Sequence, residues 1–107
     1  MYLVERKIKV LKEFSEAILL KQQQQSVVTK FKGFLKTEVF IDRKNNEYDV
    51  ITSLIYFESK KDFYRWQGSP EHIAMHKSPN HGKKPEGVLE VSRASYDYVA
   101  TINYQGE

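Results

Sequence analysis

Residues 48–77 read YDVITSLIYFESKKDFYRWQGSPEHIAMHK, and the signals in this segment constrain the rest of the chain. Residues 48–58 are rich in β-branched and aromatic side chains, which is typical of a strand. Ser59 and Asp62, three residues apart, resemble a capping box and predict the start of a helix. Because Gly68 is a helix breaker, we expect this helix to be short and to follow the strand directly.

A second short helix is predicted after Gly68. Ser69 suits the N-cap position and Pro70 the first helical position, while Glu71 complements the helix dipole. We expect this helix to run to about Lys77. The following residues, 78–87, contain prolines, glycines and an asparagine, so they predict a mobile loop.

Outside this segment the sequence predicts four further elements. These are a strand over residues 2–11, a helix from about 14 to 30, a strand over 34–42 and a long final strand over 88–104. Gly33 permits the turn into the second strand. The order strand, helix, strand, strand, helix, strand is that of the ferredoxin-like split βαβ arrangement. We therefore expect an α+β fold, an antiparallel sheet with helices on one face.

Arg6 lies on the apolar face of the first predicted strand. That strand alternates, with Tyr2, Val4, Ile8 and Val10 on the same face as Arg6. A buried charge without a partner is costly, so Arg6 is expected at a pocket wall or an edge, where its guanidinium reaches water or an anion.

Composition restricts the class of protein. A chain of 107 residues has room for one domain, 1–107, and for no separate cofactor domain. Without cysteines there is no disulfide, thiolate metal site or cysteine nucleophile, which fits a reducing compartment, and we expect a cytoplasmic location. The N-terminus alternates as a strand does, so no signal peptide is expected. No apolar run is long enough to span a bilayer, so no membrane association is expected.

The net charge of +3 arises from 17 Lys and Arg interspersed with 14 Asp and Glu. A nucleic-acid interface needs basic residues clustered on one face, and none is expected here. The mild positive excess suits a small anionic ligand that carries carboxylates. Arg93 and Asp97 share one face of the last predicted strand and are interpreted as a surface ion pair.

His76 and Trp66 are the candidates for chemistry. A helical histidine that faces an apolar sheet can present a neutral imidazole nitrogen to haem iron. Trp66 lies ten residues earlier, and the intervening helix break lets both side chains face one side of the sheet. His72 and His76 also have a spacing that can chelate zinc, although no third ligand is evident. A structural or surface role for either histidine is the simplest alternative.

The segments 56–66 and 69–77, together with residues 31–35, resemble the Isd-type haem-degrading monooxygenases of the antibiotic-biosynthesis-monooxygenase-like superfamily. This resemblance implies a ferredoxin-like homodimer whose sheets meet in an α/β barrel, with haem held between the sheet and the two short helices. It implies that His76 binds the iron, that Trp66 distorts the porphyrin, and that Phe63 and Ile73 line the haem site. Haem would be both cofactor and substrate, and a reductase would donate the electrons for ring opening.

One feature of the family differs in this sequence. The family usually has an asparagine at the position of the first strand that the apolar alternation assigns to Arg6. Arginine also donates hydrogen bonds but is longer and charged, so Arg6 is expected to position dioxygen differently or to bind a haem propionate. Three alternatives stay open: a haem-binding protein without catalysis, a cofactor-free monooxygenase that acts on a small aromatic substrate, and a structural dimer without a ligand.

Overall fold

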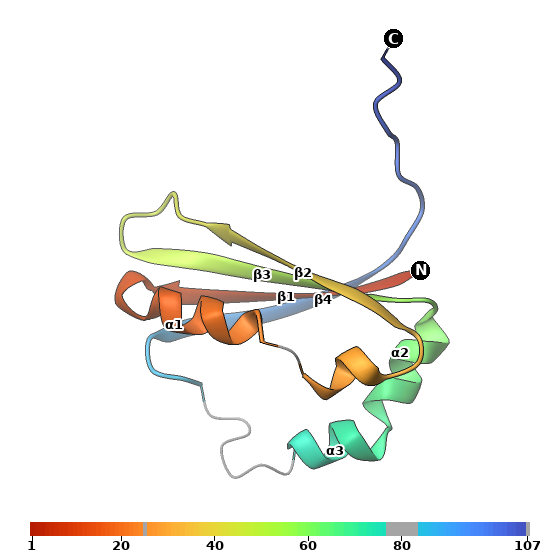
Figure 1. Cartoon of the computed structure of the whole chain (residues 1–107). Helices are drawn as coiled ribbons and strands as arrows, with labels where there is room; N and C mark the ends of the chain where they lie inside the picture. Colours follow the sequence, from red (N-terminus) through yellow and green to blue (C-terminus); the bar gives the residue numbers. More distant parts are fainter. Residues whose placement is uncertain (25, 77–83, 107) are drawn as a thin grey trace.

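The computed structural model of the chain describes residues 1–24, 26–76 and 84–106, and the side chain of His76 lies outside this description. Its elements, in chain order, are β1 (Tyr2–Leu11), α1 (Lys12–Gln22), the 3₁₀ helix η1 (Val27–Lys30), β2 (Phe34–Asp42), β3 (Tyr48–Phe57), α2 (Lys60–Gln67), α3 (Pro70–His76) and β4 (Val88–Asp97) (Figure 1).

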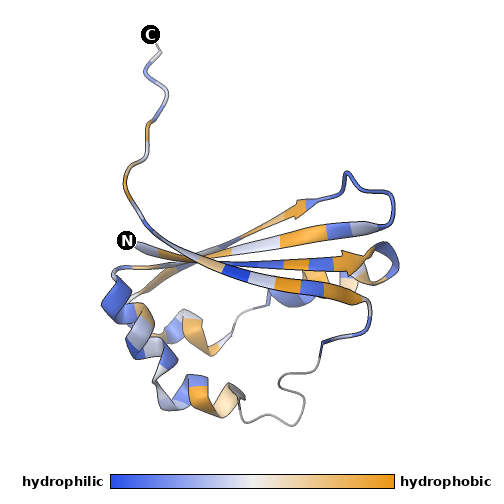
Figure 2. Ribbon diagram, turned by 180° about the vertical axis from the view of Figure 1, so that it is seen from behind, coloured by the Kyte–Doolittle hydropathy of each residue, from blue (hydrophilic) through white to orange (hydrophobic). Residues whose placement is uncertain are grey.

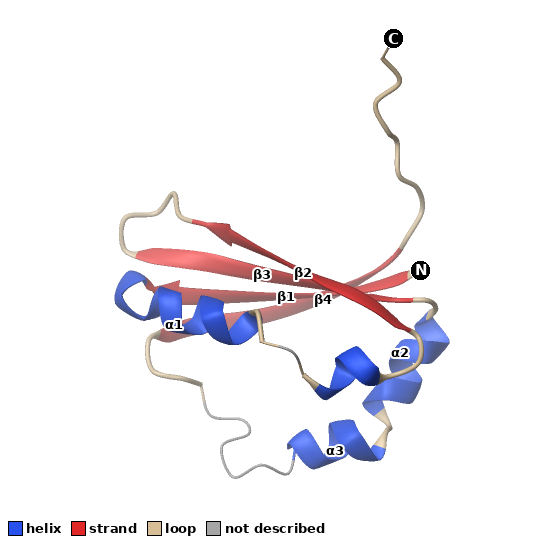
Figure 3. Ribbon diagram, in the orientation of Figure 1, coloured by secondary structure: helices blue, strands red, loops and turns tan. Residues whose placement is uncertain are grey.

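The four strands form one antiparallel sheet in the order β2-β3-β1-β4. The helices α1, α2 and α3 all lie on the same side of this sheet (Figure 3). We call the face that they cover the inner face and the opposite face the outer face. This arrangement confirms the predicted ferredoxin-like α+β fold, including the helices on one face of the sheet.

Apolar and polar residues alternate along the strands, as Figure 2 shows. In β1 this alternation determines which side chains face the helices. One buried cluster lies under α1 and another lies against η1 and α2. The first comprises Ile8, Val10, Ile18 and Ile51, and the second comprises Val28, Phe57 and Trp66. Between the two clusters, the middle of the inner face is polar, because Arg6 and Ser53 are paired across β1 and β3.

The helix predicted to reach residue 30 ends earlier, at Gln22, and that part of the prediction is wrong. Ser26 has extended backbone angles, and a separate 3₁₀ turn, η1, follows it. Two physical reasons account for the break. Val27, Val28 and Thr29 are β-branched and favour an α-helix only weakly, and the reoriented chain buries Val28 against Phe57 and Trp66.

The final strand is also shorter than predicted, because β4 ends at Asp97 instead of continuing to residue 104. Its neighbour β1 begins at Tyr2, which pairs with Asp97, and the amide of Tyr98 bonds to the carbonyl of Met1. Beyond this point β4 has no adjacent strand with which to form a ladder. Residues 98–106 instead run away from the sheet, on the side opposite to the helices (Figure 1). Of the predicted loop 78–87, residues 78–83 lie outside the described residues.

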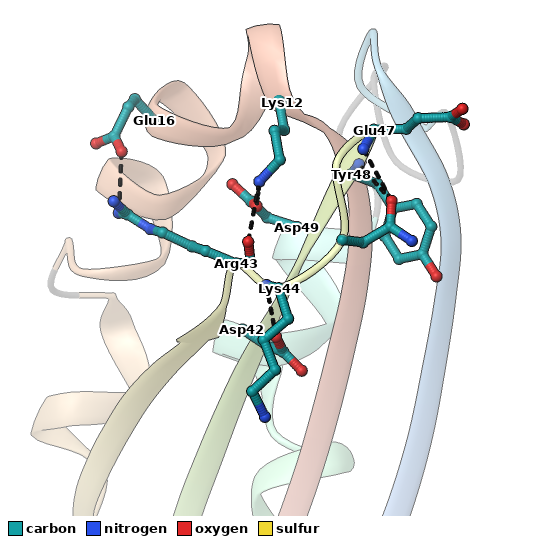
Figure 4. A network of polar contacts seen from close by, with 9 residues as sticks. Lys12, Glu16, Asp42, Arg43, Lys44, Glu47, Tyr48 and Asp49 are labelled. Atoms are coloured by element: carbon teal, nitrogen blue, oxygen red, sulfur yellow. Dashed lines mark hydrogen bonds and ion pairs between the residues drawn. The ribbon is translucent and has the colours of Figure 1, made fainter.

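A polar network joins the start of α1 to the β2–β3 hairpin (Figure 4). The ammonium of Lys12 lies 2.5 Å from the carboxylate of buried Asp49 and also donates to the carbonyl of Arg43. The guanidinium of Arg43 pairs with Glu16 at 3.0 Å. The hydrogen bond from Lys12 lowers the pKa of the Asp49 carboxyl below its ordinary value, so this carboxylate stays ionised at neutral pH. These contacts hold α1 across one end of the inner face.

Among the described residues, none of the helices combines the length and the apolar character that a membrane span requires.

Candidate functional site

The position of α2 is set by contacts at its N-terminal end. Ser59 accepts a hydrogen bond from the amide of Asp62, as the capping signal predicts. The carboxylate of Asp62 pairs with Arg65, whose guanidinium also donates to the carbonyl of Lys32 at 2.6 Å. Gly33 has a φ of +104°, and a β-carbon at this residue would lie 2.6 Å from the Asp62 carboxyl carbon. The turn before β2 and the start of α2 are therefore packed so closely that only glycine fits.

Ser69 holds the corner between α2 and α3. Its hydroxyl donates to the carbonyl of Trp66 at 2.7 Å and accepts from the amide of His72 at 3.2 Å. The side chain is buried, so water does not compete for either bond. This confirms Ser69 as the N-cap of the second short helix, and it fixes the angle at which α3 leaves α2.

Trp66 is a core residue in this structure, with 7% of its surface exposed. Its indole packs edge-on against Phe31 at a centroid distance of 5.3 Å and against the His72 ring at 5.2 Å. Aromatic pairs with this geometry add to the stabilisation that comes from burial alone. The indole thus anchors η1, α2 and α3 to one another.

Of the two histidines of α3, the structure describes the side chain of His72 only. His72 directs Nδ1 at the carbonyl of Gln67 at 2.9 Å, and since a carbonyl only accepts, Nδ1 carries the proton. His76 is the last residue of α3, and its side chain lies outside the described part of the chain. Its predicted role as iron ligand stays a prediction. The described residues contain no group of three or more metal-binding side chains, and the pairing of His72 with His76 is not tested by them.

Phe63 and Ile73 were predicted to line the same site but have different surroundings. The ring of Phe63 packs between Tyr2 at 5.6 Å and Phe57 at 5.4 Å, so it belongs to the core beside Trp66. Ile73 lies on α3 with 44% of its surface exposed. Of the two, the side chain of Ile73 is the more accessible to a ligand.

Arg6 lies where the alternation predicts, on the inner face, and it is partly buried. Its Nε atom is buried and has no hydrogen-bond partner among the described residues. Arg93 of β4 is the residue directly opposite, and cross-strand partners share a face of the sheet. Burial, and secondly the charge of Arg93, lower the pKa of the Arg6 guanidinium below its ordinary value.

The sequence interpretation paired Arg93 with Asp97 and missed the position of Arg93 opposite Arg6. In the structure Asp97 is opposite Tyr2, and the described residues contain no ion pair of Arg93. The only signal that identifies Arg93 as the neighbour of Arg6 is the register of β1 on β4. That register depends on residues far apart in the sequence.

A depression of about 190 Å³ lies beside Trp66, lined by Val27, Lys30, Phe31, Trp66 and Glu71. Ligand pockets for drug-sized molecules usually span roughly 300–1,000 Å³, so this depression alone is too small for a tetrapyrrole. A ligand of that size needs space beyond this depression.

The family model described as antibiotic biosynthesis monooxygenase matches residues 1–78, more than half of the chain. The chain belongs to this family. The part that matches the antibiotic biosynthesis monooxygenases includes every candidate site residue, from Arg6 through Trp66 to His76.

Curated relatives of this family member come from several bacteria. A haem-degrading monooxygenase of Bacillus thuringiensis is 32% identical over 65 residues, which are 61% of this chain and 59% of the relative. The matched region thus spans about three-fifths of that relative's length. A staphylobilin-producing haem oxygenase of Staphylococcus saprophyticus is 28% identical over 89 residues, covering 83% of this chain and 86% of the relative.

Solved structures share the family fold. A Bacillus cereus protein described as an antibiotic biosynthesis monooxygenase has a TM-score of 0.79 at 19% identity, covering 96% of this chain and 97% of that one. The haem-degrader MhuD of Mycobacterium tuberculosis, solved with two haems in its active site, has a TM-score of 0.60 at 19% identity. That match covers 94% of this chain and 99% of MhuD. At these identities the likeness concerns the fold.

Proposed function

We propose that this chain is a haem-binding monooxygenase that opens the macrocycle oxidatively and releases iron. The observation that carries the proposal is the family match over residues 1–78, which contains all candidate site residues. Relatives described as haem-degrading, at 32% and 28% identity, support it. Arg6 supports it from the structure, because its buried Nε, which has no partner in the described part of the chain, suits a ligand with carboxylates, as haem has.

Each candidate residue has a distinct role in this proposal. His76 would hold the iron from the end of α3, and Ile73 would contact the ring from the exposed side of the same helix. Trp66 and Phe63 would form the wall behind it, since both pack in the adjoining core cluster. Arg6 would face the ligand from the sheet. Haem supplies, when bound, the iron at which dioxygen is activated.

In this proposal, Trp66 is the residue that strains the bound haem ring. A rigid side chain that bends a bound molecule raises its energy towards the transition state, and binding energy elsewhere must compensate. The rigidity is present here, because Phe31 and His72 hold the indole edge-on and Ser69 holds its backbone carbonyl. A reductase as electron donor and a cytoplasmic location complete the proposal.

The test is an absorbance titration of the purified full chain with haem, followed by a reductant under air. We expect a Soret band at a stoichiometry of one haem per chain, then its loss together with release of iron to a chelator. A stable Soret band after reduction would instead identify a haem-binding protein without catalysis. An unchanged haem spectrum would favour a cofactor-free monooxygenase with a smaller substrate, which the 190 Å³ depression could hold.

We also propose that two copies pair through the outer face of the sheet. No described helix covers this face, although Phe40 is 50% exposed there and Leu54, Tyr56 and Tyr96 lie on the same side. The segment 98–106 adds Val99, Ile102 and Tyr104, which are 91%, 93% and 87% exposed. Isolated apolar side chains at a surface are common, but a sheet face and an apolar arm together suit an interface.

Removing residues 99–107 is expected to shift the protein from dimer to monomer at micromolar concentration, because the arm's apolar contacts with the second copy are lost. Light scattering during size-exclusion chromatography measures the mass. The triple variant Val99→Ser, Ile102→Ser, Tyr104→Ser keeps the length of the arm and should have the same effect. A parent protein that elutes as a monomer would refute the pairing, and a dimeric truncated form would refute the role of the arm.

A further inference from the structure

We propose that Arg6 and Arg93 together form a carboxylate-binding site in the middle of the inner face, and that this site recognises an acidic group of the ligand. This inference deepens the proposed function by assigning the ligand's carboxylate to two named residues. It does not require that the ligand contain iron.

The first argument is the pairing of like charges. Arg6 and Arg93 are direct cross-strand partners, and such partners have β-carbons about 4.5–5.5 Å apart. Like charges placed directly opposite each other destabilise a sheet, and burial of Arg6 increases the cost. An anion bound between the two guanidinium groups removes this repulsion.

The second argument is the lack of an internal counter-ion. The sheet positions that surround Arg6 on the inner face carry no acidic side chain: they are Val4, Ile8, Ile51, Ser53, Ile55, Val91, Arg93 and Ser95. Among the described residues, neither arginine side chain forms a hydrogen bond or an ion pair, and Nε of Arg6 is buried without a partner. The site is therefore cationic and unneutralised within the described chain.

The third argument is chemical preference. A guanidinium offers donors in a planar fork that matches the two oxygens of a carboxylate, and Nε takes part in that fork. On the β3 side of Arg6 lies Ser53, which is small and buried. On the β4 side lies Arg93, which is exposed. An acidic group can thus approach from the β4 side and reach the partly buried guanidinium of Arg6.

Metal-free protoporphyrin IX and its dimethyl ester test the proposal without iron. Trp66 is the only tryptophan, so quenching of its fluorescence reports binding of either compound to the full chain. We expect the parent to bind the free acid at least about tenfold more tightly than the ester, as the loss of one charge-assisted bond predicts. Arg6→Gln and Arg93→Gln should each abolish most of this preference. Arg43→Gln removes an equal charge at the hairpin, and it should leave the preference unchanged.

A second measurement tests the carboxylate site independently of haem binding. Sodium benzoate should raise the melting temperature of the parent and of Arg43→Gln, and it should have little effect on Arg6→Gln. If porphyrins fail to bind but benzoate stabilises the parent through Arg6, the carboxylate site stands and the haem function fails. Equal binding of acid and ester, or no effect of benzoate on the parent, would overturn the site. A large fall in melting temperature on Arg6→Gln without ligand would also overturn it, since the guanidinium would then be structural.

Discussion

The substitution His76→Ala is expected to abolish the Soret spectrum of ligated haem and, with it, ring opening. The proposed site has one protein ligand to the iron, and an alanine methyl group cannot replace the imidazole nitrogen. Haem that still associates through apolar contacts should show the spectrum of unligated haem. Absorbance titration measures both effects, and added imidazole should restore part of the ligated spectrum in the variant.

His72→Gln is the matched control, because His72 lies one helical turn earlier on α3. Glutamine keeps a group that can donate to the carbonyl of Gln67, which the His72 ring contacts at 2.9 Å. This variant should retain the Soret band. If His72→Gln loses it and His76→Ala keeps it, the iron ligand is His72 and the assignment of His76 is wrong.

Local signals predicted most of the fold. The bounds of β1 and β2 agree with the alternation and with the turn at Gly33, whose positive φ explains why glycine is needed there. The caps Ser59 and Ser69 were also predicted, since capping depends on residues within one turn. Signals of this kind act over three or four residues, so they can be seen in the sequence alone.

The errors arose where distant residues decide the outcome. The first helix breaks after Gln22 because Val28 packs against Phe57 and Trp66, which are about thirty residues away or more. Likewise β4 ends at Asp97 because its partner strand begins at Tyr2. Periodicity within one segment carries no information on either contact.

For the candidate site, too, the sequence predicted the features set by local signals and missed those set by distant residues. The inner-face position of Arg6 follows from alternation along one strand, and it was predicted. The proximity of Arg93 follows from the register of two strands that are more than eighty residues apart, and it was not. Trp66 was named from the sequence as a candidate for chemistry, and its burial in the core was not predicted, because spacing does not distinguish a core indole from one that faces a ligand.

Trp66→Ala is expected to lower the free energy of unfolding by about 3–5 kcal/mol, the cost usual for a large aromatic side chain removed from a core. The indole connects η1, α2 and α3, so its loss leaves a cavity that Phe31 and His72 can fill only partly. Urea unfolding followed by circular dichroism measures the change. Leu20→Ala, at a residue of α1 that is 64% exposed, is the control and should change stability by less than about 1 kcal/mol.

Trp66→Phe separates the packing of this residue from its proposed action on haem. Phenylalanine fills much of the volume and keeps an aromatic edge for Phe31, so most of the stability should be retained. If Trp66 strains the ring, this variant should bind haem but open it more slowly, because the smaller side chain presses less on the macrocycle. If ring opening proceeds at the parent's rate, Trp66 acts only by fixing the angle between α2 and α3, and the strain must come from another residue.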